Sequence, residues 1–176
     1  ESLKSIELAR SYKGKIWATA GIHPHNASNA SENFKEDLMA ILNHDEVVAI
    51  GECGLDYFRN FSSKEEQRKI FKVHLELAHK VDLPLFLHQR DAHDDFLGMI
   101  KDYGPKELKG VAHCFTGSKE QMESYLDLGL YIGVTGWLCD SRRNSELLGA
   151  INYIPKDRLL IETDSPYLMP KSLSKS

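Results

Sequence analysis

Short apolar segments alternate with amphipathic helical segments along the whole 176-residue chain, and few folds accommodate such a pattern. Strands are predicted at residues 16–22, 47–51, 85–87, 110–112, 131–134 and 158–162. Before and between them, apolar residues recur every three to four positions and predict helices over residues 5–12, 34–44, 63–81, 92–103, 118–128 and 146–153. Because parallel neighbouring strands need crossover connections, this alternation predicts a parallel α/β fold.

Two of the predicted helices begin with a capping box. Ser63 is followed three residues later by Glu66, and Ser118 is followed at the same spacing by Gln121. In this motif the serine hydroxyl and the acidic or amide side chain each accept a hydrogen bond from the other residue's backbone N–H. We therefore expect helices to start at these two serines.

Polar side chains of the metal-binding type lie at or just past the carboxyl ends of five predicted strands. They are His23, Glu52, His88, His113 and Asp164. An open doubly wound sheet places its site at one switch point, whereas a closed barrel gathers such residues from all its strands onto one face. The pattern favours a (β/α)8 TIM-type barrel, of which this chain supplies about six of eight strands. Because such a barrel typically needs about 250 residues, we expect residues 1–176 to form a single barrel domain truncated at both ends.

The segment "VVAIGECGLD" carries two carboxylates, Glu52 and Asp56, after a run of apolar residues that is typical of a buried strand. A charge at the end of a buried strand costs free energy unless a salt bridge, protonation or a metal ion compensates it. Two of the strand-end histidines with the carboxylates of Glu52 and Asp164 form a nitrogen and oxygen ligand set that suits a divalent metal, which makes Glu52 a predicted ligand. Each of them alone could instead be a hydrogen-bonded structural residue, but their shared position at strand ends favours the metal site.

Charge and composition limit the partners of the chain. The formal net charge is −4 with a pI near 6.1, and no run of Lys or Arg is present, so a strongly basic nucleic-acid-binding face is excluded. No apolar run reaches the roughly 18 residues of a membrane span, and no signal peptide opens the chain, so no membrane partner is expected. The three cysteines lack paired spacing, which indicates a reducing compartment. We expect a cytoplasmic monomer.

Several segments resemble the signature segments of the TatD family of metal-dependent deoxyribonucleases. They are "GIHPH", "AIGECGLD", "LHQRDAH", "HCFTG", "YIGVTGWLCDSRR" and "LLIETDSPYLMP", in that order. The resemblance runs along almost the whole chain and is greatest for the bacterial members. It implies a barrel of the metal-dependent hydrolase superfamily and a magnesium-dependent nuclease that acts as a 3'-5' exonuclease on single-stranded DNA or RNA.

The resemblance also implies roles for individual residues. Glu52, His88 and His113 would bind the metal, and Asp164 would bind or orient the attacking water. Glu52 and Asp164 are therefore the predicted catalytic residues, with Asp164 also counted among the metal ligands. The implied cofactor is a divalent metal, Mg²⁺ first, with Mn²⁺ and Zn²⁺ as alternatives.

Further residues lie on the same predicted face and could contact the substrate. The predicted substrate-binding residues are His23, His25, Arg90, His93, Arg142 and Arg143. The arginines could grip a backbone phosphate, or they could belong to solvated loops. The aromatic residues Tyr57, Phe58 and Trp137 could stack on unpaired bases, or they could simply pack within their loops.

Two alternatives to a nuclease stay open. The same ligand set could serve a hydrolase of the same superfamily that acts on another bond, such as an aminoacyl-tRNA ester or a cyclic amide. The chain could also be an inactive truncated remnant whose site residues persist without function. Activity on single-stranded DNA with and without a chelator separates the nuclease from both.

Overall fold

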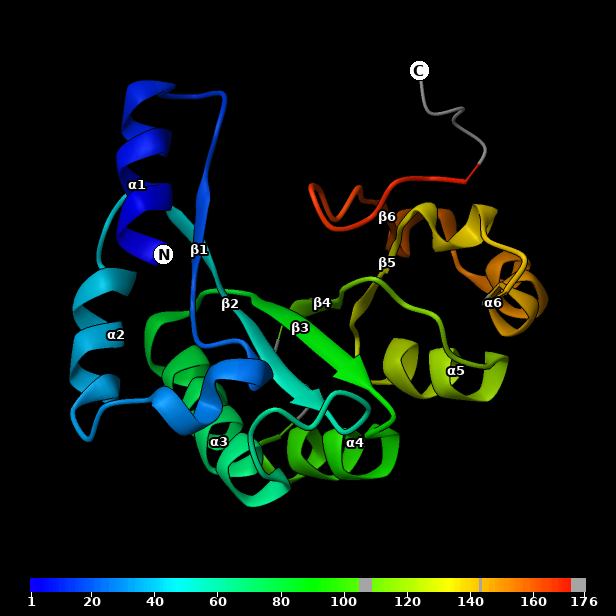
Figure 1. Ribbon diagram of the computed structural model, residues 1–176, viewed down its shortest axis with the longest axis horizontal. Helices are drawn as coiled ribbons and strands as arrows, with labels where there is room; N and C mark the ends of the chain where they lie inside the picture. The colour runs from blue at the N-terminus through cyan, green and yellow to red at the C-terminus, as the bar shows by residue number, and fades with distance from the viewer. Residues whose placement is uncertain (105–108, 143, 172–176) are drawn as a thin grey trace. The chain divides into compact units, whose positions relative to one another are not determined.

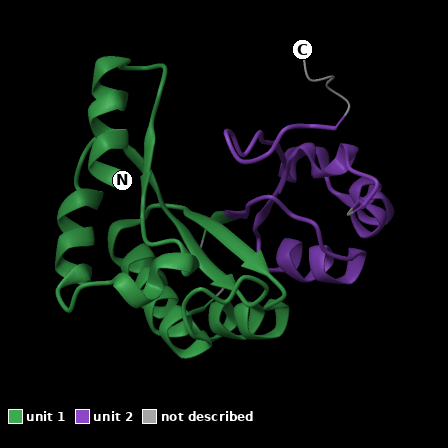
Figure 2. Cartoon of the chain, viewed as in Figure 1, with its two compact units in different colours: residues 1–110 green, residues 111–176 purple. Residues whose placement is uncertain are grey.

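The computed structural model describes residues 1–104, 109–142 and 144–171, which form two compact units (Figure 2). The first unit is Glu1–Gly110 and the second is Val111–Ser176. Each unit alternates strands with helices, as the periodicity predicts (Figure 1). A single truncated barrel domain over residues 1–176 stays a prediction.

The first unit is built on three parallel strands. Strand β1 (Ala18–Ala20) pairs with β2 (Val47–Asp56), and β2 pairs with β3 (Leu85–Arg90). The helices of this unit are α1 (Ser2–Ser11), the 3-10 helix η1 (Pro24–Asn29), α2 (Phe34–Leu42), α3 (Lys64–Val81) and α4 (His93–Asp102). Helices α1 and α2 lie beside β1, while α3 and α4 lie beside β2 and β3 (Figure 1).

The core of the first unit lies between its strands and helices α3 and α4. Phe71 of α3 stacks on Phe96 of α4 with ring centroids 5.5 Å apart, and both side chains are almost fully buried. Leu85 and Leu87 of β3 are buried as well. Burying side chains of this size stabilises the fold by about 1.5–3 kcal/mol each, so the core fixes the strands that carry the polar residues.

The second unit also contains three parallel strands. Strand β4 (Gly110–Ala112) pairs with β5 (Tyr131–Val134), and β5 pairs with β6 (Leu159–Ile161). Its helices are α5 (Lys119–Asp127), α6 (Ser145–Ala150) and the 3-10 helices η2 (Gly136–Cys139), η3 (Ile151–Tyr153) and η4 (Lys156–Arg158). Met122, Tyr125, Ile132 and Leu147 are fully buried and form its core.

The predicted strands and helices are confirmed, with shifted ends. The strand expected at residues 16–22 is only Ala18–Ala20, and Ile16 and Trp17 before it are exposed. The helix expected at residues 146–153 is α-helical only as far as Ala150 and then continues as η3. Both capping boxes are present, with Ser63 paired to Glu66 and Ser118 paired to Gln121.

Strand β2 is longer than its apolar run predicts. It was expected to end at Gly51 but continues to Asp56, so Glu52 lies inside the strand. His88 likewise lies within β3 and does not end it. The prediction that all the polar residues lie at or past strand ends is therefore wrong for Glu52 and His88. The reason is the pairing of β2 with β3, which continues beyond the apolar residues.

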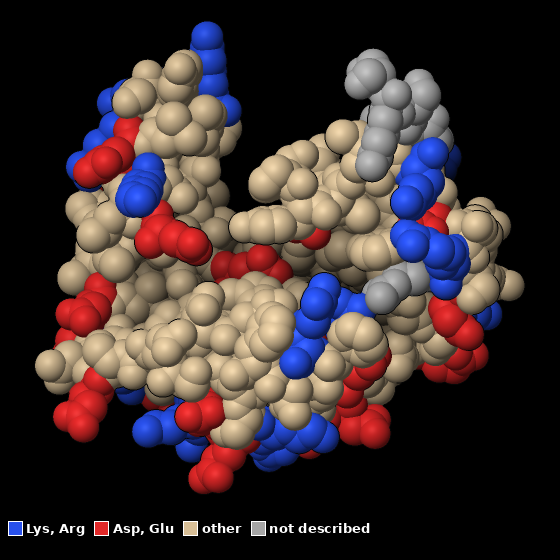
Figure 3. Space-filling model, viewed as in Figure 1, with Lys and Arg blue, Asp and Glu red and all other residues tan. Residues whose placement is uncertain are grey.

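Charges of both signs are mixed on one face of the described residues. On the face drawn in Figure 3, Lys and Arg side chains lie in small groups among Asp and Glu side chains and form no continuous basic face. None of the helices in the described part of the chain combines the length and the apolarity needed to cross a bilayer.

Candidate functional site

One face of β2 carries the polar residues of the first unit. Successive side chains of a strand point to opposite faces, and Cys53 and Leu55 are fully buried on one of them. Glu52 and Asp56 lie on the other face, where both contact His88, and Gly54 lies between them in the strand. Gly54 has a φ of +140°, and a Cβ atom there would collide with the backbone oxygen of His88. The missing side chain lets β3 come close to the two carboxylates.

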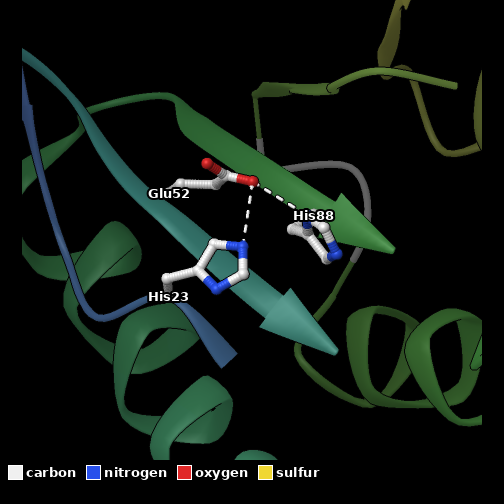
Figure 4. Close-up of side chains that lie close together, drawn as sticks. All are labelled: His23, Glu52 and His88. Carbon is white, nitrogen blue, oxygen red and sulfur yellow. Dashed lines mark hydrogen bonds and ion pairs between the residues drawn. The ribbon is translucent and has the colours of Figure 1, made fainter. Parts of the chain in front are cut away.

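The Glu52 carboxylate lies between two histidines (Figure 4). Its Oε1 atom is 2.8 Å from His88 Nδ1 and 3.4 Å from His23 Nε2. His23 follows β1, so the three side chains come from three neighbouring strands of the unit. Each offers one ligand atom, and these atoms all lie within 4.8 Å of one another. This is a compact set of two nitrogen donors and one oxygen donor.

Asp56 adds a second carboxylate to this group and contacts two histidines, His25 and His88. Its side chain is buried, and Oδ2 lies 2.6 Å from His25 Nε2 and 3.3 Å from His88 Nε2. Oδ1 accepts hydrogen bonds from the backbone N–H groups of Phe58 and Arg59. Asp56 is absent from the predicted site residues, although its distance of four residues from Glu52 on one strand was a usable signal.

The charges of this group stabilise one another. Burial alone would raise the pKa of Glu52, but hydrogen bonds from His23 and His88 lower it below its usual range. Burial would also raise the pKa of Asp56, and its histidine and backbone N–H contacts lower it. Burial would lower the pKa of His88, yet the two carboxylates raise it. Burial lowers the pKa of His25 in spite of Asp56. Both carboxylates are therefore ionised at neutral pH.

The side chains present fit a divalent metal. Within the described residues, the buried Nε2 atom of His88 makes no hydrogen bond, because Asp56 Oδ2 lies 3.3 Å away without the required alignment. Buried polar nitrogens are normally satisfied, so this one is available for another partner. Two ionised carboxylates beside imidazole nitrogens are the donors that divalent ions take in proteins.

A second group surrounds His113 in the second unit. His113 directly follows β4 and is buried, with Nδ1 2.9 Å from Glu162 Oε2 and Nε2 3.6 Å from Asp164 Oδ1. Glu162 directly follows β6, and its carboxylate lies over Gly133 of β5. A Cβ atom at Gly133 would collide with this carboxylate, so the glycine is what lets Glu162 reach His113.

Cys114 belongs to the same group. Its sulfur, a nitrogen of His113 and an oxygen of Asp164 lie within 4.8 Å of one another. Its backbone N–H donates to Glu162 Oε2 at 2.9 Å, and its Sγ lies 3.3 Å from Thr135 Oγ1. Neither Cys114 nor Glu162 is among the predicted site residues, although Cys114 directly follows His113 and Glu162 lies two residues before Asp164.

The predicted metal ligands divide between the two units. Glu52 and His88 adjoin in the first unit, and His113 and Asp164 adjoin in the second. The complete set of four ligands stays a prediction.

The other predicted contacts of the first unit lie around the same strands. Arg90 ends β3, and its guanidinium lies 3.8 Å from the ring centroid of Phe58. His93 is the first residue of α4. Tyr57 is half-buried, and its hydroxyl donates to Asp95 Oδ2 at 2.6 Å. Tyr57 therefore packs against the protein, which is one of the two alternatives considered for the aromatic residues.

The predicted contacts of the second unit are held differently. Arg142 forms a bidentate salt bridge with Asp140, in which Nε donates to Oδ1 at 2.9 Å and Nη2 donates to Oδ2 at 2.6 Å. Its guanidinium is therefore oriented by a carboxylate, and phosphate binding by Arg142 stays a prediction. Arg143 lies outside the described residues. Trp137 is half-buried in η2.

The segment that carries His23 is anchored by a buried histidine of α3. His74 Nε2 accepts a hydrogen bond from the backbone N–H of Ile22 at 3.0 Å. Its Nδ1 therefore carries the proton and donates to the carbonyl oxygen of Ile70 at 2.8 Å. Burial lowers the pKa of His74 to about 4. The neutral ring fixes the segment that follows β1 and leads to His23.

This anchor makes a testable prediction about pH. Below pH 6.5 the unfolded chain protonates His74, whereas the folded protein does not until about pH 4. The unfolded state therefore binds more protons in this range, and stability falls as the pH decreases. We expect His74 to contribute a loss of about 2 kcal/mol in unfolding free energy between pH 7 and pH 5. Urea unfolding at both pH values measures this loss.

The controls for this measurement come from the same helix. His74→Gln should lack this part of the pH dependence, whereas His79→Gln should keep it because His79 is exposed. An equal decrease in the wild type and in His74→Gln would show that His74 is not the responsible group.

The family model and the sequence relatives of this chain agree with each other. The family model described as TatD related DNase matches residues 1–176. The 3'-5' ssDNA/RNA exonuclease TatD of Salmonella typhimurium is 47% identical over 174 residues, which are 99% of this chain and 66% of that protein. The protein of the same name from Klebsiella pneumoniae is 49% identical over 98% of this chain and 65% of its own length. The chain thus spans just under two thirds of these curated relatives.

Solved structures agree with the sequence relatives. A hydrolase TatD family protein from Entamoeba histolytica is 38% identical with a TM-score of 0.81, covering 92% of this chain and 56% of that one. A TatD homologue from Escherichia coli is 34% identical with a TM-score of 0.85, covering 93% of this chain and 63% of that one. These likenesses confirm the predicted barrel fold class. Since the family model also covers every residue, the chain belongs to the TatD related DNase family.

Proposed function

We propose that this protein is a divalent-metal-dependent nuclease that hydrolyses single-stranded DNA or RNA as a 3'-5' exonuclease. The observation that carries the proposal is the group of His23, Glu52 and His88, whose ligand atoms lie within 4.8 Å of one another beside a second ionised carboxylate. The names of the curated relatives, which are 3'-5' ssDNA/RNA exonucleases, support the substrate class and the direction.

The proposed ligands of the metal are Glu52, His88, His113 and Asp164. A divalent ion held there would act as a Lewis acid on the phosphate oxygens and make an attacking water more acidic. Mg²⁺ is the proposed ion because of the oxygen ligands, and the imidazole ligands keep Mn²⁺ and Zn²⁺ as alternatives. The cation also accounts for phosphate binding by a chain whose formal net charge is −4.

The side chains of the protein itself would position the reactants. His23 and His88 hold the Glu52 carboxylate in one orientation through contacts of 3.4 and 2.8 Å. Asp164 is partly exposed and so could accept a proton from the attacking water. Arg90 is the proposed contact for a backbone phosphate on the first unit, and His25 and His93 are further proposed substrate contacts there.

We also propose that the protein acts as a cytoplasmic monomer. The three cysteines without paired spacing support a reducing compartment. Size-exclusion chromatography with light scattering tests the monomer.

The proposed function is tested by removing and restoring the metal. With Mg²⁺, a 5'-labelled single-stranded oligonucleotide should be shortened stepwise from its 3' end. A chelator should stop this shortening, and an excess of Mg²⁺ should restore it, because a chain with a formal net charge of −4 relies on the ion for positive charge at the phosphate. A phosphorothioate at the 3'-terminal linkage should block the reaction if hydrolysis starts at the 3' end.

Two results would contradict the proposal. Shortening that persists in the chelator would remove the role of the metal. No shortening with Mg²⁺, Mn²⁺ or Zn²⁺, together with hydrolysis of an aminoacyl-tRNA ester, would instead indicate the alternative hydrolase.

A further inference from the structure

The loop that follows β2, residues 57–63, is fixed at both ends. Gln67 of α3 is buried, and its side chain accepts from the N–H of Asp56 at 2.7 Å. The same side chain donates to the carbonyl oxygens of Asp56 and Ser62 at 3.0 and 2.9 Å. Asp56 Oδ1 in turn accepts from the N–H groups of Phe58 and Arg59. The path of the loop is therefore set by buried hydrogen bonds.

This fixed loop holds two aromatic rings in solvent. Phe58 is 52% exposed and Phe61 is 65% exposed, whereas the next residue, Ser62, is buried. Leaving a phenyl ring in water forgoes about 1.5–3 kcal/mol that burial would contribute. Because hydrogen bonds fix the loop on both sides of the two rings, Phe58 and Phe61 are exposed in the ordered conformation of the loop.

Both rings adjoin the predicted substrate-binding side chains. The Phe61 ring centroid lies 4.9 Å from that of His25 in an edge-to-face arrangement. The His25 ring lies 4.2 Å from that of His23, which contacts the proposed metal ligand Glu52. Phe58 lies under the Arg90 guanidinium at 3.8 Å. The rings thus extend the polar site of the first unit outward into solvent.

We propose that Phe58 and Phe61 form a base-stacking subsite for the unpaired nucleobases of a single-stranded nucleic acid. Proteins that bind single strands combine aromatic rings, which accept the faces of the bases, with positive groups for the backbone. Phe61 supplies the more open ring, and Arg90 on Phe58 supplies the positive group. This inference rests on the proposed nuclease function and identifies the part of the protein that recognises the base.

The subsite also explains a preference for single strands over duplexes. In a duplex both faces of an internal base are stacked on neighbouring bases, so no face is free for Phe61. An unpaired base near a strand end can leave the stack and lie on the ring at small cost. Recognition through the base face is tolerant of sequence, because every base has such a face.

Stacking can be separated from backbone binding with abasic oligonucleotides. The probes are a short oligoadenylate and an abasic oligomer of equal length, both with phosphorothioate linkages so that they persist in Mg²⁺. We expect Phe61→Ala to weaken binding of the oligoadenylate by about 5- to 100-fold. Affinity for the abasic oligomer should change by less than about threefold, because its contacts are made through the backbone.

Three further measurements sharpen the test. Phe61→Trp should bind the oligoadenylate at least as well as the wild type, whereas Phe61→Leu, which keeps an apolar side chain without a ring, should bind like Phe61→Ala. Quenching of a 2-aminopurine base in the probe should be present in the wild type and lost in Phe61→Ala. Tyr12→Ala is the matched control, because Tyr12 directly follows α1 and is 53% exposed.

The outcomes that overturn the subsite differ from those that overturn the nuclease. Equal losses for the adenine and abasic probes, wild-type binding by Phe61→Leu, or no binding of either probe would reject the subsite. Hydrolysis of an unmodified oligonucleotide is measured separately. A protein that stacks the base but cleaves nothing would retain the subsite and lose the nuclease function.

Discussion

His88→Ala should weaken divalent-metal affinity by at least about 100-fold and reduce nuclease turnover by a similar factor or more. His88 is the side chain through which both carboxylates of the first unit are connected. Its Nδ1 lies 2.8 Å from Glu52 and its Nε2 lies 3.3 Å from Asp56. Alanine removes a proposed ligand and leaves two neighbouring carboxylates without the imidazole that contacts both of them. Titration calorimetry with Mg²⁺ and Mn²⁺ measures the affinity.

The fold should survive this change, because His88 projects from the face of the sheet opposite the buried Leu87. A cooperative thermal transition in the variant verifies this. His79→Ala, at an exposed position of α3, is the histidine control and should keep wild-type metal affinity. His113→Ala is the corresponding test in the second unit. Unchanged metal affinity in both His88→Ala and His113→Ala would reject the ligand assignment.

Asp164→Asn should lower turnover by about 10²- to 10⁴-fold while metal and single-stranded DNA still bind within roughly tenfold of the wild type. The carboxylate is partly exposed, and its Oδ1 lies 3.6 Å from His113 Nε2. Asparagine keeps the size of the side chain and one oxygen donor, but it cannot take a proton from water. Single-turnover kinetics, with metal and DNA affinities measured separately, distinguish the two effects.

The structure makes this substitution a clean test. The turn after Asp164 is closed by its backbone carbonyl, which accepts from the N–H groups of Tyr167 and Leu168 at 2.9 and 3.1 Å. Asparagine keeps these bonds and also tolerates the φ of +55° at this position. A purely structural Asp164 would therefore lose little activity as Asn. Near-normal turnover would reject the catalytic role, and Asp157→Asn, at an exposed position of η4, controls for the loss of one negative charge.

Strand β2 shows where prediction from the sequence reached its limit. The apolar run before Gly51 correctly predicts a buried strand, but residues 52–56 contain two charges and one glycine, which no local preference assigns to a strand. Pairing with β3 keeps them extended. The same pairing brings His88 beside Gly54, so the contacts of Glu52 and Asp56 depend on a strand more than 30 residues away.

Glu162 and Cys114 show the same limit in the second unit. The sequence predicts His113 and Asp164 from their positions after strands, and both lie in one group. Glu162 enters this group only because Gly133 on the intervening strand leaves room for its carboxylate. Such a gap depends on strand order and register, which a single sequence does not display.

The sequence alone predicts the strand and helix alternation and both capping boxes, because periodicity and capping act between residues close in sequence. It also singles out the histidines of the two groups together with Glu52 and Asp164, but not Asp56 or Glu162. Which atoms face one another was decided by tertiary structure. The position of Glu52 between His23 and His88, the burial of Asp56 and the exposure of Phe61 all follow from pairing and packing between distant segments. These contacts depend on strand register and on the space left by glycines. The proposed metal binding and base stacking rest on these contacts, and the residue types alone do not establish them.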